Sequence, residues 1–148
     1  MNLKNEVSIR EVGAPVAAAA NTDQNSDRID MANWDGVVFV VPVTDSVSTG
    51  VATLKVEQNT ADSDTGMAAL SGAEATATCT INDDLNNKLL VVDVYRPRER
   101  YVQGVITSAT ANIAFGNTLA ILYRGRKSPV SDHSTVLDSA LVASPAEA

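Results

Sequence analysis

Cysteine, histidine and aromatic residues are scarce in this chain of 148 residues. Cys79 is the only cysteine, which excludes an intrachain disulfide and a cysteine-based zinc site, and we expect it to be a small buried core residue. His133 is the only histidine, and Ser, Asp and His occur together in Ser131–Ser134. Because neighbouring side chains of an extended chain point apart, this segment cannot supply triad geometry, and it predicts a solvated surface histidine.

The motifs that hold phosphate or metal are also missing. The glycines are scattered singly, so the chain has no glycine-rich phosphate loop. Asp62–Gly66 is similar to the start of a calcium-binding loop, but Ala73 occupies the position of the terminal glutamate and Glu74 comes one residue late. A polar hairpin loop is the better interpretation. We therefore expect no catalytic residue, no metal ion and no cofactor, and a protein that is not an enzyme.

Positive charge is in deficit: 11 Lys and Arg stand against 18 Asp and Glu, for a net charge of −7. Binding to nucleic acid requires a basic field, so we expect no direct contact with nucleic acid. The best apolar run, Gly36–Val43, is far shorter than the roughly 20 residues that cross a bilayer, and Glu6 and Glu11 do not fit the cationic start of a signal peptide. We expect a soluble protein, made in the cytoplasm, with no membrane contact.

What the chain does contain is the pattern of an all-β fold. Gly36–Val43 is continuously apolar, which predicts a strand covered on both faces. Val51–Gln58 alternates instead, with Leu54 and Val56 expected to face inward. About seven or eight short strands are separated by turn signals at a spacing of roughly 8–12 residues. This spacing, without helical periodicity, indicates an antiparallel β-sandwich or a jelly-roll-like barrel.

The chain divides into three parts. Residues 1–14 are expected to form an extended N-terminal arm, and residues 15–127 form the β-sandwich domain. Ser128–Ala148 is rich in Ser, Ala and Pro, has no Lys or Arg, and predicts an extended or flexible tail. Because arm and tail contain little apolar surface to offset the entropy of ordering, we expect contacts with other chains to order them.

Lys88–Thr107 is the most informative segment. Two strand-like runs flank Arg96–Glu99, which predicts a β-hairpin or a tight β-arch. Three arginines alternate around this bend, and Arg124–Lys127 adds three cations. Such a cluster either keeps an edge soluble or pairs with carboxylates of a neighbouring subunit, a role that suits the planar guanidinium group. The candidate protein-interface residues are Arg96, Arg98, Arg100, Tyr101, Arg124, Arg126 and Lys127.

Several segments resemble the small all-β decoration, or cement, proteins of tailed-bacteriophage capsids. They cover most of residues 15–127 and comprise Asn21–Met31, Trp34-Asp35-Gly36 before Val37–Val43, Val51–Glu57, Pro97–Val102, and Leu119–Tyr123 before a basic end. The resemblance rests on pattern and composition. It implies a virion protein on the capsid exterior, a dimer or trimer that binds the major capsid protein and bridges capsomers to stabilise the lattice, without enzymatic activity.

Other functions remain open from the sequence. Another virion component, such as a head-completion or tail protein, would share this composition. A non-viral β-sandwich binding module, for example one that binds carbohydrate, would present exposed aromatic residues. We expect Trp34 instead to be partly buried, sealing one end of the core. A small hydrolase would require a buried acid–base pair, which the sequence does not supply.

Overall fold

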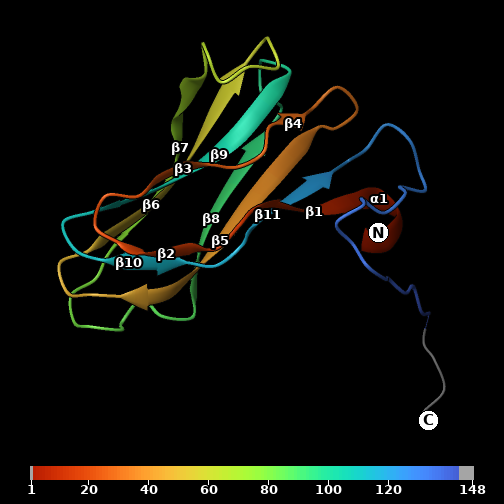
Figure 1. The fold of residues 1–148 in the computed structure, drawn as a ribbon. Coiled ribbons are helices and arrows are strands. Elements are labelled where there is room, and N and C mark those ends of the chain that lie inside the picture. The colour runs from red at the N-terminus through yellow and green to blue at the C-terminus, as the bar shows by residue number, and fades with distance from the viewer. Residues whose placement is uncertain (1, 144–148) are drawn as a thin grey trace.

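The computed structural model describes residues 2–143, which form an antiparallel β-sandwich with a short helix and an extended C-terminal segment beside it (Figure 1). This confirms the expected all-β fold. The elements of the described residues are α1 (Leu3–Glu6), β1 (Val7–Gly13), β2 (Val16–Ala19), β3 (Asp23–Asn25), β4 (Ile29–Asp30), β5 (Gly36–Ser46), β6 (Val51–Asn59), β7 (Ala68–Thr78), β8 (Lys88–Tyr95), β9 (Tyr101–Ala109), β10 (Ile113–Phe115) and β11 (Thr118–Tyr123).

Two sheets make up the sandwich. In the first sheet β5 pairs with β8 along one edge and with β11 and then β10 along the other, and β1 and β2 flank these two. In the second sheet the order is β3, β9, β6 and β7, and β4 also pairs with β9. All of these pairs are antiparallel. Each sheet is about four strands wide.

The core lies between the sheets and is filled by alternate residues of the strands. Phe39 of β5, Leu54 of β6 and Leu122 of β11 have no exposed surface. Val56 is buried as expected, whereas Val38 and Val40 on the other face of β5 are only half-buried. The prediction that Gly36–Val43 is covered on both faces is therefore wrong. The run is continuous because the outer face of this strand is also apolar, although no other element of residues 2–143 covers it.

The segment Lys88–Thr107 is a β-arch. β8 pairs with β5 in the first sheet, whereas β9 pairs with β6 in the second sheet, so the two strands share no hydrogen bonds as a hairpin would. Arg96, the first residue after β8, has a φ of 53°, a left-handed conformation that turns the chain from one sheet toward the other. The arginine-rich bend therefore spans the end of the sandwich.

Both predicted extensions contact the body. Residues 1–14 were expected to form an arm, but Val7–Gly13 is β1, whose register with β11 runs from Val7 opposite Tyr123 to Gly13 opposite Thr118. The C-terminal segment passes beside α1 and β1: the Val130 N–H donates to the carbonyl of Asn5 at 2.9 Å. Ordering of the two ends by other chains stays a prediction.

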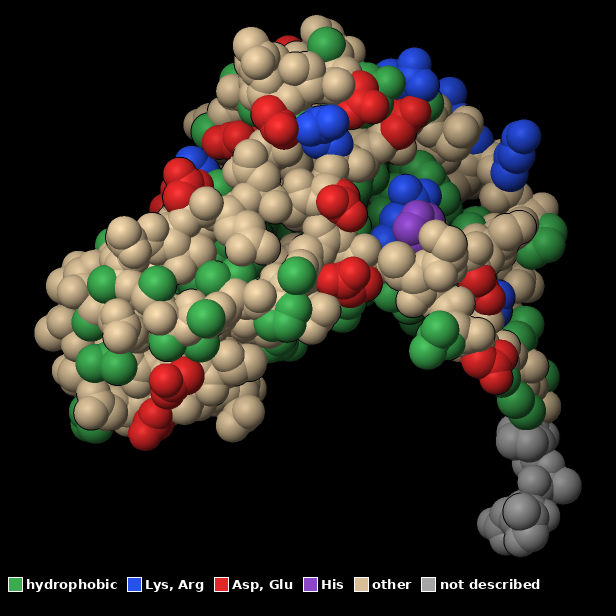
Figure 2. Space-filling view, viewed as in Figure 1, with side chains coloured by type: hydrophobic (Ala, Val, Ile, Leu, Met, Phe, Trp, Pro, Cys, Tyr) green, Lys and Arg blue, Asp and Glu red, His purple; other side chains and the backbone are tan. Residues whose placement is uncertain are grey.

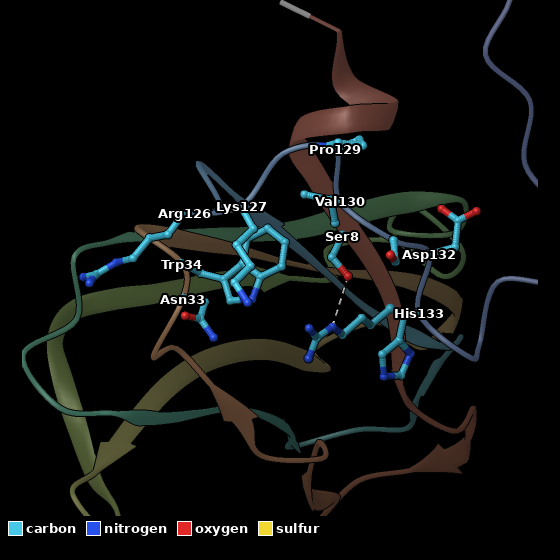
Figure 3. A pocket seen from close by; sticks show the side chains of 12 residues that line it. Ser8, Asn33, Trp34, Arg126, Lys127, Pro129, Val130, Asp132 and His133 are labelled. Carbon is cyan, nitrogen blue, oxygen red and sulfur yellow. Dashed lines mark hydrogen bonds between the residues drawn. The ribbon is translucent and has the colours of Figure 1, made fainter.

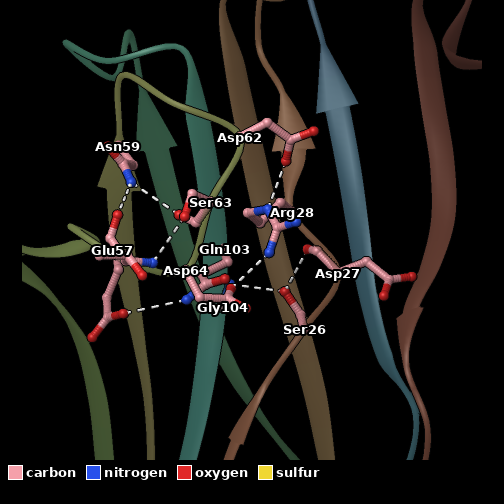
Figure 4. Close-up of polar contacts among 11 residues, drawn as sticks. Ser26, Asp27, Arg28, Glu57, Asn59, Asp62, Ser63, Asp64, Gln103 and Gly104 are labelled. Carbon is pink, nitrogen blue, oxygen red and sulfur yellow. Dashed lines mark hydrogen bonds and ion pairs between the residues drawn. The ribbon is translucent and has the colours of Figure 1, made fainter.

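A polar clamp holds two loops over the second sheet (Figure 4). Nε of Arg28 lies 2.6 Å from a carboxylate oxygen of Asp62, and its Nη1 lies 2.7 Å from one of Asp64. The segment that is similar to a calcium loop is thus the hairpin loop between β6 and β7, with its carboxylates paired to an arginine. Within residues 2–143, no group of three or more His, Cys, Asp or Glu is placed to hold a metal ion.

Cys79, just after β7, is buried, as expected, and burial raises the pKa of its thiol. In the part of the chain that the structure describes, α1 falls well short of the length that a membrane-crossing helix needs, and no other helix is long and apolar enough.

Candidate functional site: the cationic end of the sandwich

The fold brings the two cationic segments of the sequence to the same end of the molecule. β8 and β11 flank β5 on opposite edges, and both end opposite Gly36, at Tyr95 and Tyr123 respectively. The β-arch that follows β8 and the loop that follows β11 therefore emerge side by side. This is the cationic end, and it contains all the predicted interface residues: Arg96, Arg98, Arg100, Tyr101, Arg124, Arg126 and Lys127.

Tyr95 organises two of these cations. The guanidinium carbon of Arg96 lies 5.1 Å from the centroid of the Tyr95 ring, and that of Arg124 lies 6.0 Å from it. Arg124 also donates to the Tyr95 hydroxyl at 3.4 Å and lies 3.8 Å from a carboxylate oxygen of Asp35. Guanidinium groups are attracted to aromatic faces at such distances. Tyr95 was not among the predicted interface residues, although it directly precedes the arch.

Arg100 differs from the other arginines of the arch because it is paired within the chain. Its Nε and Nη2 donate to the two carboxylate oxygens of Asp30 at 2.9 and 2.7 Å. The Arg100 guanidinium holds the pKa of Asp30 below its ordinary value. Pairing of the arginines with carboxylates of a neighbouring subunit was one of the two interpretations of the sequence. Arg100 already has a carboxylate partner within the chain, because β4 places Asp30 directly opposite Tyr101.

A groove of about 540 Å³ lies between the arch and the turn that precedes β5. Arg96, Arg98 and Arg126 line it, together with Met31 and Trp34. Arg100 and the acidic residues Asp35 and Glu99 line it too, so cations outnumber carboxylates there by four to two. Neither Arg96, Arg98 nor Arg126 forms an ion pair with another of residues 2–143. The groove therefore offers guanidinium donors beside an apolar wall, which is the chemistry that binds a carboxylate-bearing protein segment.

A second pocket, of about 400 Å³, lies on the other side of Trp34 (Figure 3). Arg10 reaches into it from β1: its Nε donates to the Ser8 hydroxyl at 3.2 Å, and its guanidinium carbon lies 6.0 Å from the Trp34 centroid. Arg126 and Lys127 line this pocket too. Burial lowers the pKa of Arg10, because it disfavours the charged form, and the charge of Asp30 opposes this shift only in part. No carboxylate among the described residues forms an ion pair with Arg10.

His133 lines the same pocket and is half-buried, so the expectation of a solvated surface histidine is wrong. Figure 2 shows it in a hollow beside Lys or Arg side chains. Burial, and then the charge of Arg10, lower the pKa of His133, which keeps its imidazole neutral at pH 7. The sequence could not reveal this position, because it depends on the C-terminal segment returning to β1. Trp34 is half-buried between the two hollows and packs against the core, as expected.

Comparisons with known proteins show the fold. No protein-family model matches the chain, and no curated protein matches it. Among solved structures, the chain is similar to the PBSX exported protein XepA, with a TM-score of 0.56 and 14% identity over 96% of this chain and 45% of that one. It thus spans less than half of that protein. A structure of infectious bursal disease virus, Gx strain, matches with a TM-score of 0.48 and 12% identity over 83% of this chain and 34% of that one.

Proposed function

We propose that this protein is a non-enzymatic structural component of a phage particle, which binds the outer surface of the capsid through its cationic end. The partner is an acidic segment of the major capsid protein, and the bound protein bridges capsomers and stabilises the lattice. The observation that carries the proposal is the convergence of Arg96, Arg98 and Arg126 on one groove, without carboxylate partners among the described residues.

The charge distribution supports a protein partner rather than nucleic acid. The chain carries a net charge of −7, so its long-range field repels a phosphate backbone. A local cluster of guanidinium groups on an acidic body instead selects a compact acidic surface that fits the groove. Arginine is enriched at the centres of protein interfaces, where Trp and Met are also common, and Trp34 and Met31 line the same groove.

The test is retention on purified capsids that lack the protein. The triple variant Arg96→Ala, Arg98→Ala, Arg126→Ala should lose most of its binding, because truncating one side of a buried interfacial ion pair costs about 2–5 kcal/mol. The control is Lys55→Ala with Lys88→Ala, which removes cations from other parts of the fold and should bind capsids as the parent does. If the triple variant also binds capsids as the parent does, the cationic end is not the capsid contact.

Two alternative functions predict different results. A head-completion or tail protein would be present in a few copies at one vertex or in the tail, whereas a lattice-stabilising protein would cover the capsid shell, which electron microscopy of the particle distinguishes. A non-viral binding module would bind no capsid at all. In that case the groove would still bind acidic peptides, and the triple variant would lose that binding.

A further inference from the structure

The outer face of the first sheet is largely apolar where β1, β11, β5 and β8 lie side by side. Residues that lie opposite each other in an antiparallel sheet share a face, so the register defines rows of neighbours. One row consists of Ile9, Ile121 and Val38 and ends at Asp93. The next consists of Val91, Val40 and Leu119 and ends at Glu11. Pro42 and Leu89 follow as a third pair. Leu89 is 60% exposed, and Ile9 and Val91 are each 48% exposed.

The second sheet has a polar outer face, which makes the contrast informative. Its rows join Thr76, Thr53 and Thr107, then Glu74, Lys55 and Val105, and then Glu57 and Gln103. Val105 and Gln103 on β9 are buried, so the exposed polar part of this face lies on β6 and β7. One-sided burial of an antiparallel sheet normally leaves a polar face of this kind in contact with water. The first sheet lacks that alternation, because valine, isoleucine and leucine occupy both its inner and its outer positions.

We propose that a second copy of this chain covers the outer face of the first sheet. The residues from Ile9 to Val91 span four strands, and with strands about 4.8 Å apart and residues about 3.3 Å apart the face covers roughly 400 Å² in projection. The largest apolar patch of a typical monomer is about 300–600 Å², and such patches are often functional. A flat apolar face is complementary to itself, which a symmetric dimer interface requires.

The C-terminal segment supplies further area at the rim of this face. Val136 lines a groove of about 260 Å³ together with Val7 and Ile9, so this segment lies against the outer face at β1. Leu137 next to it is fully exposed, and Leu141 and Val142 are more than half exposed. In a face-to-face dimer these side chains lie against the partner. The sheet face alone is about half of the roughly 800 Å² that each partner buries in a standard interface, and the segment adds to it.

The charge of the chain predicts how the dimer depends on salt. Two acidic residues, Asp93 and Glu11, end these rows. The Tyr123 hydroxyl donates to Asp93 at 2.6 Å, and the Asn117 side-chain amide donates to Glu11 at 3.0 Å. Two copies of net charge −7 repel each other at a distance, while the contact itself is apolar. Added salt screens this repulsion, so the dimer should tighten as NaCl rises. Binding of an acidic partner at the cationic end should weaken under the same change.

The test is analytical ultracentrifugation of the whole protein over a range of concentrations, at low and at high salt. The parent should form a reversible dimer that salt strengthens. Val91→Lys and, separately, Ile9→Lys place a charge on the apolar face and should raise the dimer dissociation constant at least about tenfold, because association must bury that charge. Ala109→Lys is the matched control, since Ala109 is exposed at the end of β9 in the second sheet.

Circular dichroism and thermal unfolding in dilute solution establish that each variant is folded. A parent that stays monomeric up to its solubility limit overturns the inference, as does dimerisation of both lysine variants with the affinity of the parent. These results leave the proposed function untouched, because capsid binding is measured with different residues. Conversely, a parent that dimerises but does not bind capsids contradicts the proposed function alone.

Discussion

Arg100 and Asp30 form a two-bond ion pair that fastens β4 to the beginning of β9. Arg96 and Arg98, four and two residues earlier, form no ion pair with any residue of the described range 2–143. Three arginines that alternate in the sequence therefore divide into one that holds the fold and two that face a groove. The consequence is a separation of effects that mutation can measure.

The single variants Arg100→Ala and Arg98→Ala should have opposite profiles. Loss of Arg100 removes the partner of Asp30 and should lower the melting temperature slightly, since exposed ion pairs contribute little. Loss of Arg98 should leave the melting temperature unchanged and weaken capsid binding more than loss of Arg100 does. Thermal unfolding and capsid pull-down on the same preparations check this. Equal effects of the two variants in both assays would contradict the division of roles.

Gly36→Ala should destabilise the fold by about 1–3 kcal/mol, the usual cost of overpacking. The Tyr123 ring lies directly over Gly36, so a methyl group there would overlap the ring and displace it. Burial, and then the hydrogen bond to Asp93, raise the pKa of Tyr123 above its ordinary value. Spectrophotometric titration of the variant should therefore show this tyrosine ionising at a lower pH than in the parent.

Asp93→Asn is the control for this ring. It removes the carboxylate without adding volume at Gly36, so it should also lower the pKa of Tyr123 while costing less stability than Gly36→Ala. If Gly36→Ala unfolds at the same denaturant concentration as the parent, the ring is free to move and the contact contributes nothing.

Asp84 should make the stability of the fold sensitive to acid. Its carboxylate accepts hydrogen bonds from the Thr80 hydroxyl at 2.7 Å and from the backbone N–H groups of Thr80 and Ile81 at 3.0 and 3.3 Å. These bonds, the Thr80 side chain foremost, hold the pKa of Asp84 well below its ordinary value. A depressed pKa stabilises the folded state above the unfolded pKa of about 3.9, and this contribution is lost as the pH falls toward the folded value.

Asp84→Asn should accordingly have a lower melting temperature than the parent at pH 7. Below pH 4 the two melting temperatures should approach each other. Thermal unfolding between pH 2 and pH 7 measures this. Asp83→Asn is a suitable control, because Asp83 belongs to the same turn and its carboxylate accepts a hydrogen bond only from the Asn86 amide among the described residues. A constant difference across the whole pH range would show that the Asp84 charge is not responsible.

Ending the chain at Lys127 should loosen α1 and the outer edge of β1 while leaving the core intact. Truncation removes the hydrogen bond from Val130 to Asn5, the 2.9 Å ion pair of Lys4 with Asp132, and the bond that the Glu11 N–H donates to the Thr135 hydroxyl at 3.2 Å. Hydrogen exchange should become faster in residues 3–11 and stay unchanged in β5. Unchanged exchange throughout would show that the segment does not protect this edge.

The all-β fold could be predicted from sequence, because turn residues separate short apolar runs throughout the chain. The strand β1 could not: Val7–Gly13 alternates Val, Ile and Val12 with polar residues only irregularly, and Arg10 occupies an inward-facing position. That arginine is tolerated because its side chain lies in a pocket at this end of the sandwich, against the Trp34 ring. A rule that places charges outward therefore misses it.

The candidate site was predictable in part. Clustering of arginines in two segments identified the residues, and the β-arch and the adjacent end of β11 bring them together. The Arg100 pair with Asp30 was not predictable, since it depends on a two-residue strand, β4, lying beside β9. Nor could the position of His133 be predicted, because it depends on a long-range return of the chain.

The pairing of β1 with β11 has a consequence for synthesis on the ribosome. Val7 lies opposite Tyr123, so the partner of β1 is made more than a hundred residues later. At a translation rate of about 5–20 residues per second, β11 is synthesised several seconds or more after β1. The inner sheet partners β5 and β8 are completed earlier, and contacts this distant in sequence form slowly, on a scale of roughly milliseconds to seconds. The pairing of β1 with β11 should thus form later than the pairing of β5 with β8.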